Sequence, residues 1–189
     1  ILHNTQEEIR LVDEYYGEPG KSSIKYAAEG ALFKPSTDVI LVGHAHANNK
    51  KRYTDVKLRV GELDKTLIVF GNRYWEKSTA SFEASEPETF ERIPLVYELA
   101  FGGTDDTDTE NPEAESYNPV GIGFRENESK KPILGSFLPN IENPGRLIRS
   151  YNDHPEPAGF SFIAPNWKPR LQFAGTYDEK WRSKKAPLL

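Results

Sequence analysis

The stretch that decides the fold runs Val56-Lys57-Leu58-Arg59-Val60-Gly61-Glu62-Leu63-Asp64-Lys65-Thr66-Leu67-Ile68-Val69-Phe70. Over residues 56–60 apolar and charged side chains alternate, which is typical of a strand with one buried face and one wet face. Residues 61–65 contain a glycine and predict the connection, and residues 66–70 run back as a second strand. The stretch therefore predicts an antiparallel β-hairpin.

Outside this hairpin, short apolar runs bounded by Gly, Pro, Asn and Asp outnumber segments with helical periodicity. The continuous apolar run at residues 39–42 predicts a strand buried on both faces. Alternation at residues 171–177 predicts the last strand. We expect a mainly β fold of antiparallel sheets with long ordered Pro/Gly/Asn-rich loops and little helix, and a β-rich α+β fold remains open.

The composition limits the classes of partner. The chain has 189 residues, 37% of them hydrophobic, with a formal net charge of −5, so we expect a single domain spanning residues 1–189 that does not bind nucleic acid. It has no cysteine, which excludes disulfides, thiol catalysis and cysteine-ligated zinc. No apolar run is long enough to cross a membrane. Because the chain begins at Ile1 and lacks methionine, we expect it to be part of a longer protein.

Residues 104–116 are the most polar part of the chain. Six carboxylates lie in this stretch, and Ala114 is its one apolar residue. Such a run predicts an acidic surface loop. Calcium binding is disfavoured because the spacing lacks the glycine and terminal glutamate of the helix-loop-helix calcium site.

Two histidines form the most direct candidate for chemistry. His44 and His46 are separated by one residue, so on a strand both rings would lie on the same face and could meet a metal ion. Asp38, Asp55 or His154 could complete such a site. Two histidines at a polar strand end are more often ordinary hydrogen-bonding groups. A metal-assisted hydrolase using His44 and His46 is therefore the alternative function, and the favoured interpretation has no cofactor.

Two glycine motifs, Phe101-Gly102-Gly103 and Gly121-Ile122-Gly123, are similar to loops that cradle phosphate. Neither has the G-x-G-x-x-G spacing followed by an amphipathic helix. We interpret both as backbone turns.

Arginine repeatedly neighbours aromatic residues, in Arg73-Tyr74-Trp75, Phe124-Arg125 and Trp181-Arg182, and Trp167 lies close to Arg170. Guanidinium groups stacked on rings can rigidify long loops, and the same residue types form the energetic centres of protein interfaces. A third possibility is carbohydrate or envelope-peptide binding through the three tryptophans, which requires an exposed ring in a groove.

A set of motifs in one order resembles a bacterial family. These motifs are Lys34-Pro35-Ser36-Thr37-Asp38-Val39, Gly43-His44-Ala45-His46-Ala47, Phe70-Gly71-Asn72-Arg73-Tyr74-Trp75, residues 94–103, Asn118-Pro119-Val120-Gly121-Ile122-Gly123, Leu138-Pro139-Asn140-Ile141-Glu142, Pro157-Ala158-Gly159-Phe160 and residues 170–181. Together they resemble the domain-of-unknown-function family DUF2169 over nearly the whole chain.

The resemblance implies a function that composition and periodicity do not address. Members are typically encoded in type VI secretion clusters and look like cytoplasmic adaptors or chaperones. The resemblance implies that they load toxin effectors carrying a PAAR-like spike-tip domain onto the secretion spike protein. The resemblance carries over no catalytic residue. The expected partner-binding or loop-fixing residues are His44, His46, Arg73, Trp75, Asn118, Arg170, Tyr177 and Trp181.

Overall fold

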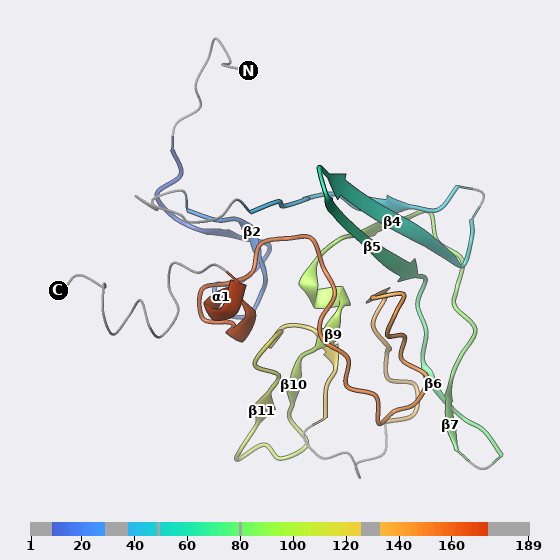
Figure 1. Ribbon diagram of the computed structural model, residues 1–189. Coiled ribbons are helices and arrows are strands. Elements are labelled where there is room, and N and C mark those ends of the chain that lie inside the picture. Colours follow the sequence, from blue (N-terminus) through green and yellow to red (C-terminus); the bar gives the residue numbers. More distant parts are fainter. Residues whose placement is uncertain (1–8, 29–37, 49, 80, 126–132, 174–189) are drawn as a thin grey trace. The chain divides into compact units, whose positions relative to one another are not determined.

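Short antiparallel strands joined by long loops make up the fold (Figure 1). The structure is a computed structural model that describes residues 9–28, 38–48, 50–79, 81–125 and 133–173. Its regular elements are mostly strands, with a single short α-helix in the described residues. The predicted class, a mainly β protein of antiparallel sheets with little helix, is confirmed.

Contacts within the chain define two compact units. Unit 1 comprises Ile1–Asp38 and Phe162–Leu189, and unit 2 comprises Val39–Ser161. Compactness alone does not make either unit an independently folding domain, so the expected single domain stays a prediction.

The largest sheet lies in unit 2 and has the strand order β13-β5-β4. Strands β4 (Tyr53–Val60) and β5 (Leu63–Phe70) form the predicted hairpin in continuous register from Tyr53↔Phe70 to Val60↔Leu63. The connection has two residues rather than the predicted five, because Leu63, Asp64 and Lys65 belong to β5. Gly61 has a φ of 59°, which suits the first position of a tight hairpin turn. The third strand, β13 (Ile141–Glu142), pairs with Val69 and Ile68.

The remaining strands of unit 2 form two-stranded pairs. They are β3 (His44–His46) with β8 (Arg92–Pro94), β6 (Trp75–Lys77) with β7 (Phe82–Ala84), β10 (Thr104–Asp105) with β11 (Glu113–Ala114), and β9 (Phe101–Gly102) with β12 (Ile122–Gly123). All are antiparallel except the last pair, which is parallel. A 3-10 helix, η1 (Tyr97–Leu99), leads into β9.

One hydrophobic cluster brings together residues from distant loops of unit 2. Trp75, Phe101, Leu138 and Ile148 are buried, and Phe82, Phe124 and Tyr151 pack against them. Burial of rings on this scale compensates for the ordering of long irregular segments. The cluster therefore holds the loops that the strand pairs leave unpaired.

Unit 1 contains the hairpin of β1 (Glu14–Tyr15) and β2 (Ile24–Tyr26), together with helix α1 (Lys168–Phe173). The helix contradicts the strand predicted at residues 171–177, of which residues 174–177 lie outside the described residues. Pro169 falls in the first helical turn, where the missing backbone N–H costs nothing.

Two further expectations need correction in detail. Residues 39–42 are only partly buried and carry no strand assignment, with the side chain of Val42 38% exposed. Pairing begins two residues later, at β3, where Ala45 is buried against β8. The acidic stretch at 104–116 is mostly exposed, but it closes into the β10–β11 hairpin and buries Asp105.

Candidate functional site

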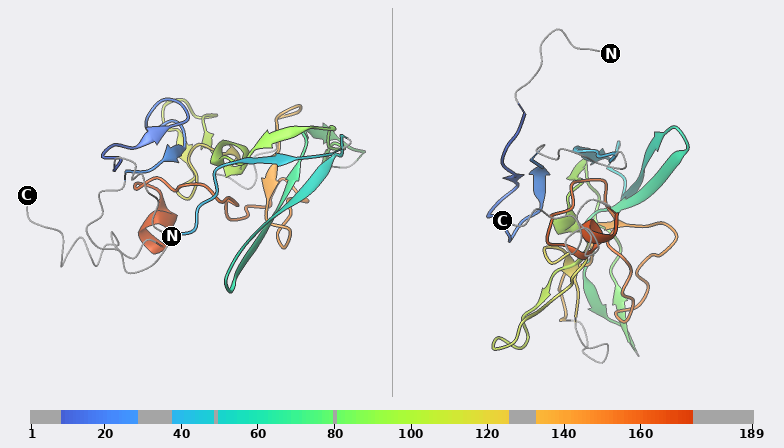
Figure 2. Two further views of the ribbon diagram at one scale, coloured as in Figure 1. Left: turned by 90° about the horizontal axis from the view of Figure 1, so that it is seen from above. Right: turned by 60° about the vertical axis from the view of Figure 1, so that its left-hand side comes forward.

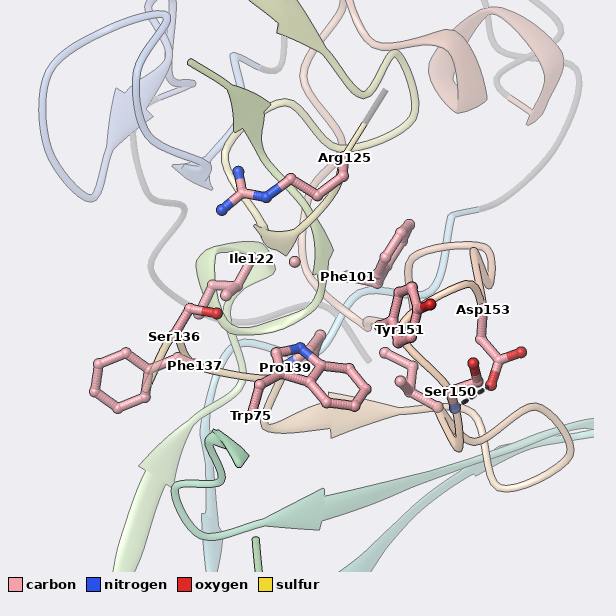
Figure 3. Close-up of a pocket in the computed structure, with 12 residues that line it drawn as sticks. Trp75, Phe101, Ile122, Arg125, Ser136, Phe137, Pro139, Ser150, Tyr151 and Asp153 are labelled. Atoms are coloured by element: carbon pink, nitrogen blue, oxygen red, sulfur yellow. Dashed lines mark hydrogen bonds between the residues drawn. The ribbon is translucent and has the colours of Figure 1, made fainter. Parts of the chain in front are cut away.

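An open pocket of about 310 Å³ lies in unit 2 (Figure 3). Five segments that are far apart in the sequence form its wall: β6, β9, β12 with the residues just after it, and the loops at 136–139 and 148–153. The lining residues are Trp75, Phe101, Ile122, Gly123, Arg125, Ser136, Phe137, Pro139, Ile148, Ser150, Tyr151 and Asp153.

Aromatic rings dominate the pocket wall. The Tyr151 ring meets Trp75 edge-on at a centroid distance of 6.5 Å, and Figure 3 shows both close to Phe101. Phe137 lies at the other end of the pocket, 48% exposed and 4.7 Å from the ring of Tyr74. Some of these rings belong to the core of unit 2, and the exposed ring of Phe137 gives the pocket a surface that a ligand can reach. The wall therefore suits an apolar or aromatic group.

The charged groups of the pocket already hold loops in place. Asp153 Oδ2 accepts hydrogen bonds of 2.8 Å from the backbone N–H groups of Arg149 and Ser150. The Arg125 guanidinium lies 3.6 Å from the carboxylate of Asp105, whose side chain is 1% exposed. Asp105 also accepts two hydrogen bonds from Thr107. These charges shape the wall and leave its rings as the main contact surface.

Arg73 holds two segments of the pocket wall in place. Its guanidinium is buried, pairs with the buried carboxylate of Glu142 and donates to the carbonyl of Pro139. It also stacks on Phe70, with Cζ 4.0 Å from the ring centroid. The second Glu142 oxygen accepts the Ile148 N–H at 2.8 Å. One ion pair thus fixes both the Pro139 and the Ile148 walls of the pocket.

Asn118 fixes the opposite wall. It is fully buried, and its side-chain amide donates to the carbonyls of Tyr97 and Phe101 at 2.8 and 2.9 Å. The two glycine motifs meet here, because Phe101 pairs with Ile122 and Gly102 with Gly123. A Cβ on Gly121 would lie 2.4 Å from Asn118 Nδ2, so the close approach requires glycine. These motifs accordingly pack against each other as backbone turns.

His44 and His46 lie on the exposed face of β3 and do not line the pocket. Their ring centroids are 6.4 Å apart, so the sequence correctly placed them on one face. Arg92 Nη2 donates to His44 Nδ1 at 3.0 Å, and desolvation, together with the charges of Arg92 and His46, lowers the pKa of His44. Within the described part of the chain, no group of three or more His, Asp or Glu residues is placed to hold a metal ion.

Of the remaining predicted site residues, those that the structure describes do not line this pocket apart from Trp75. Arg170 is half-buried on α1 in unit 1, and Tyr177 and Trp181 lie outside the described residues. Trp75 lines the pocket although it is 7% exposed, while Trp167 is 3% exposed in unit 1. Arg73, Trp75 and Asn118 are therefore the predicted residues that the fold brings together.

Comparison with known proteins places the chain in a family. The sequence profile of DUF2169, described as an uncharacterized protein conserved in bacteria, matches residues 1–189. The chain belongs to the DUF2169 family. No curated protein and no solved structure matches it. In the described residues of this DUF2169 chain, no helix combines the length and apolar composition of a membrane span.

Sequence reasoning missed much of the pocket of this DUF2169 protein. Arg125 was visible as the neighbour of Phe124, but its buried partner Asp105 lay in a stretch interpreted as solvated. Phe137, Tyr151 and Asp153 carried no motif that distinguished them from other loop residues. Their common location comes from contacts between loops, which local patterns do not encode.

Proposed function

We propose that this chain is a non-enzymatic adaptor of the bacterial cytoplasm. It binds a type VI secretion effector through the effector's PAAR-like spike-tip domain and helps to load it onto the secretion spike. Membership of DUF2169 supports this proposal through the function that the motif resemblance implies. The observation that carries it is the aromatic pocket of unit 2.

The pocket has the features of a site for a partner's side chain. Aromatic residues in desolvated pockets supply most of the binding energy in many protein interfaces. Here the Trp75 and Tyr151 rings are held in place by the core, so little conformational entropy is lost when a partner binds them. A bulky apolar side chain of the effector fits the volume of about 310 Å³.

The first experiment is co-purification. The protein is co-expressed in full length with an effector that carries a PAAR-like domain and is encoded in the same gene cluster. We expect the two to elute together as a stable complex, and the isolated PAAR-like domain to compete for binding. Failure to co-elute with any effector of the cluster would contradict the adaptor function.

A matched pair of variants tests the pocket itself. Phe137→Asp places a charge on the pocket wall, whereas Leu134→Asp places one on a residue of similar exposure, 56% against 48%, that does not line the pocket. We expect Phe137→Asp to weaken effector binding at least about tenfold and Leu134→Asp to leave it nearly unchanged. Equal effects of the two substitutions would remove the pocket from the interface.

The alternative is a metal-assisted hydrolase using His44 and His46, favoured by the position of both rings on one exposed face of β3. It requires near-stoichiometric binding of zinc or another divalent ion. Zinc titration of the wild-type protein and of the His44→Ala/His46→Ala variant separates the functions. Zinc uptake by the wild type that the variant lacks would support the hydrolase, whereas a wild-type protein that takes up no zinc at this face would contradict it.

A further inference from the structure

Strand β4 is an edge of the β13-β5-β4 sheet, and its outer side offers backbone groups for pairing. The backbone carbonyl of Arg52 accepts a hydrogen bond from the Gly71 N–H, so the backbone groups of Arg52 point toward β5. The carbonyl of Lys51 points the other way and accepts from the Phe90 N–H. Alternation along the strand then turns the backbone groups of Tyr53, Asp55, Lys57 and Arg59 outward. Among the described residues, these outward groups have no backbone partner.

The free edge is well defined at both ends. Phe90 covers it at Lys51, and the strand stops at the Gly61 turn. Figure 2 shows the teal β4–β5 hairpin projecting beyond the other segments of its unit. The four side chains between these limits, at positions 53, 55, 57 and 59, are all exposed. An eight-residue strand with an open edge can extend its sheet by adding another strand.

The charges along β4 are self-complementary in one antiparallel register. If Val56 lies on a two-fold axis, Asp55 of each copy faces Lys57 of the other, and Tyr53 faces Arg59. These are an ion pair and a cation–π pair, and the symmetry makes each of them twice. A shift to either adjacent allowed register places Asp55 opposite Asp55 or Lys57 opposite Lys57. The register with Lys57 opposite Lys57 also sets Asp55 opposite Arg59, so the register about Val56 is favoured as the one of these three without a like-charge pair.

Backbone geometry agrees with this register. Antiparallel pairing requires outward-facing residues to lie opposite outward-facing residues, and here all four odd-numbered positions do so. The partner strand ends at its own Gly61 turn opposite Lys51, where Phe90 already occupies the edge. Lys57 also lies 2.9 Å from Asp64 of the same chain, so it is already held on this face.

We propose that β4 is a homodimerisation edge: two copies pair antiparallel about Val56 and join their three-stranded sheets into one sheet of six strands. This surface goes beyond the proposed function, since it uses no residue of the aromatic pocket. A second copy of the chain fits it because its charge pattern is the complement that the edge requires.

Charge reversal on the full chain tests the proposal. Asp55→Lys or Lys57→Asp alone places like charges opposite each other twice. Each variant should therefore raise the dissociation constant of the dimer at least about tenfold. The double variant Asp55→Lys/Lys57→Asp restores the pairing and should dimerise like the wild type. Sedimentation equilibrium over a concentration series measures all four proteins, and circular dichroism checks their folds.

Mixing the two single variants provides the decisive measurement. One edge then carries lysine at both positions and the other carries aspartate at both, so they should form a heterodimer although neither forms a stable homodimer. Formation of this heterodimer supports pairing through the two β4 edges, and wild-type-like dimerisation of the double variant supports the register about Val56. A wild-type chain that stays monomeric throughout the series, or single variants that dimerise like the wild type, would overturn the proposal. Pairing of β4 only with an extended segment of another protein would overturn it as well.

Discussion

Replacing one partner of the buried Arg73–Glu142 pair should lower the free energy of unfolding more than replacing both partners does. The side chains are 7% and 1% exposed, and they join the segment that follows β5 to β13. Arg73→Met keeps an unbranched apolar stem on the Phe70 ring but leaves the Glu142 carboxylate buried without its cation. Glu142→Gln leaves the guanidinium buried without its anion, while the amide oxygen can still accept the Ile148 N–H.

The expected magnitudes follow from the burial of both groups. Breaking a buried ion pair from one side costs about 3–5 kcal/mol, because an uncompensated charge stays in the interior. Replacing both charges removes that penalty, so Arg73→Met/Glu142→Gln should cost about 2 kcal/mol or less, mainly through the donor lost to the Pro139 carbonyl. The two substitutions should therefore couple by at least about 3 kcal/mol in a double-mutant cycle.

Urea unfolding followed by circular dichroism measures the three variants against the wild type. With a denaturant dependence of about 2 kcal/mol per molar urea, each single variant should lower the midpoint by about 2 M. The double variant should recover most of this loss. Additive effects, with the double variant as unstable as the sum of both singles, would refute the conclusion that Arg73 and Glu142 act as one buried pair.

Three further predictions test other parts of unit 2. Burial raises the pKa of Tyr97 to about 12 from 10.0, so the folded form retains a proton that the unfolded chain loses between these values. The free energy of unfolding should thus fall by about 2.7 kcal/mol as the pH rises through this window, and a pH titration of Tyr97→Phe should lack that fall. Gly71→Ala places a Cβ 1.9 Å from the Glu88 carbonyl oxygen and should cost about 3 kcal/mol or more in thermal unfolding. Gly43→Ala is its control, since the nearest atom lies at 3.5 Å. Asn118→Asp removes the donor to the carbonyls of Tyr97 and Phe101 and should cost about 3 kcal/mol or more in urea unfolding.

The sequence predicted those features that short-range patterns encode. Alternation at 56–60 correctly placed the second half of β4, but residues 63–65 were assigned to the connection because they follow Gly61 in a run that is mostly polar. The strand at 171–177 was wrong at its start because a short alternating run does not distinguish a strand from one helical turn. Arg73 was singled out, whereas its partner Glu142 lies 69 residues away and shows no local sign of burial. Charged residues are seldom buried, so residue type alone gives no reason to expect burial of either side chain.

The burial of Arg73 and Asn118 affects how any binding experiment on this protein should be interpreted. Arg73 and Asn118 were expected either to contact a partner or to fix loops, and both side chains are buried and do not line the pocket. Their removal shifts Pro139, Ile148 or Phe101, so it would weaken partner binding without any direct contact. Loss of binding at these positions is evidence of contact only if the free energy of unfolding is unchanged. Phe137 is the more informative probe, because it is half exposed and lines the pocket.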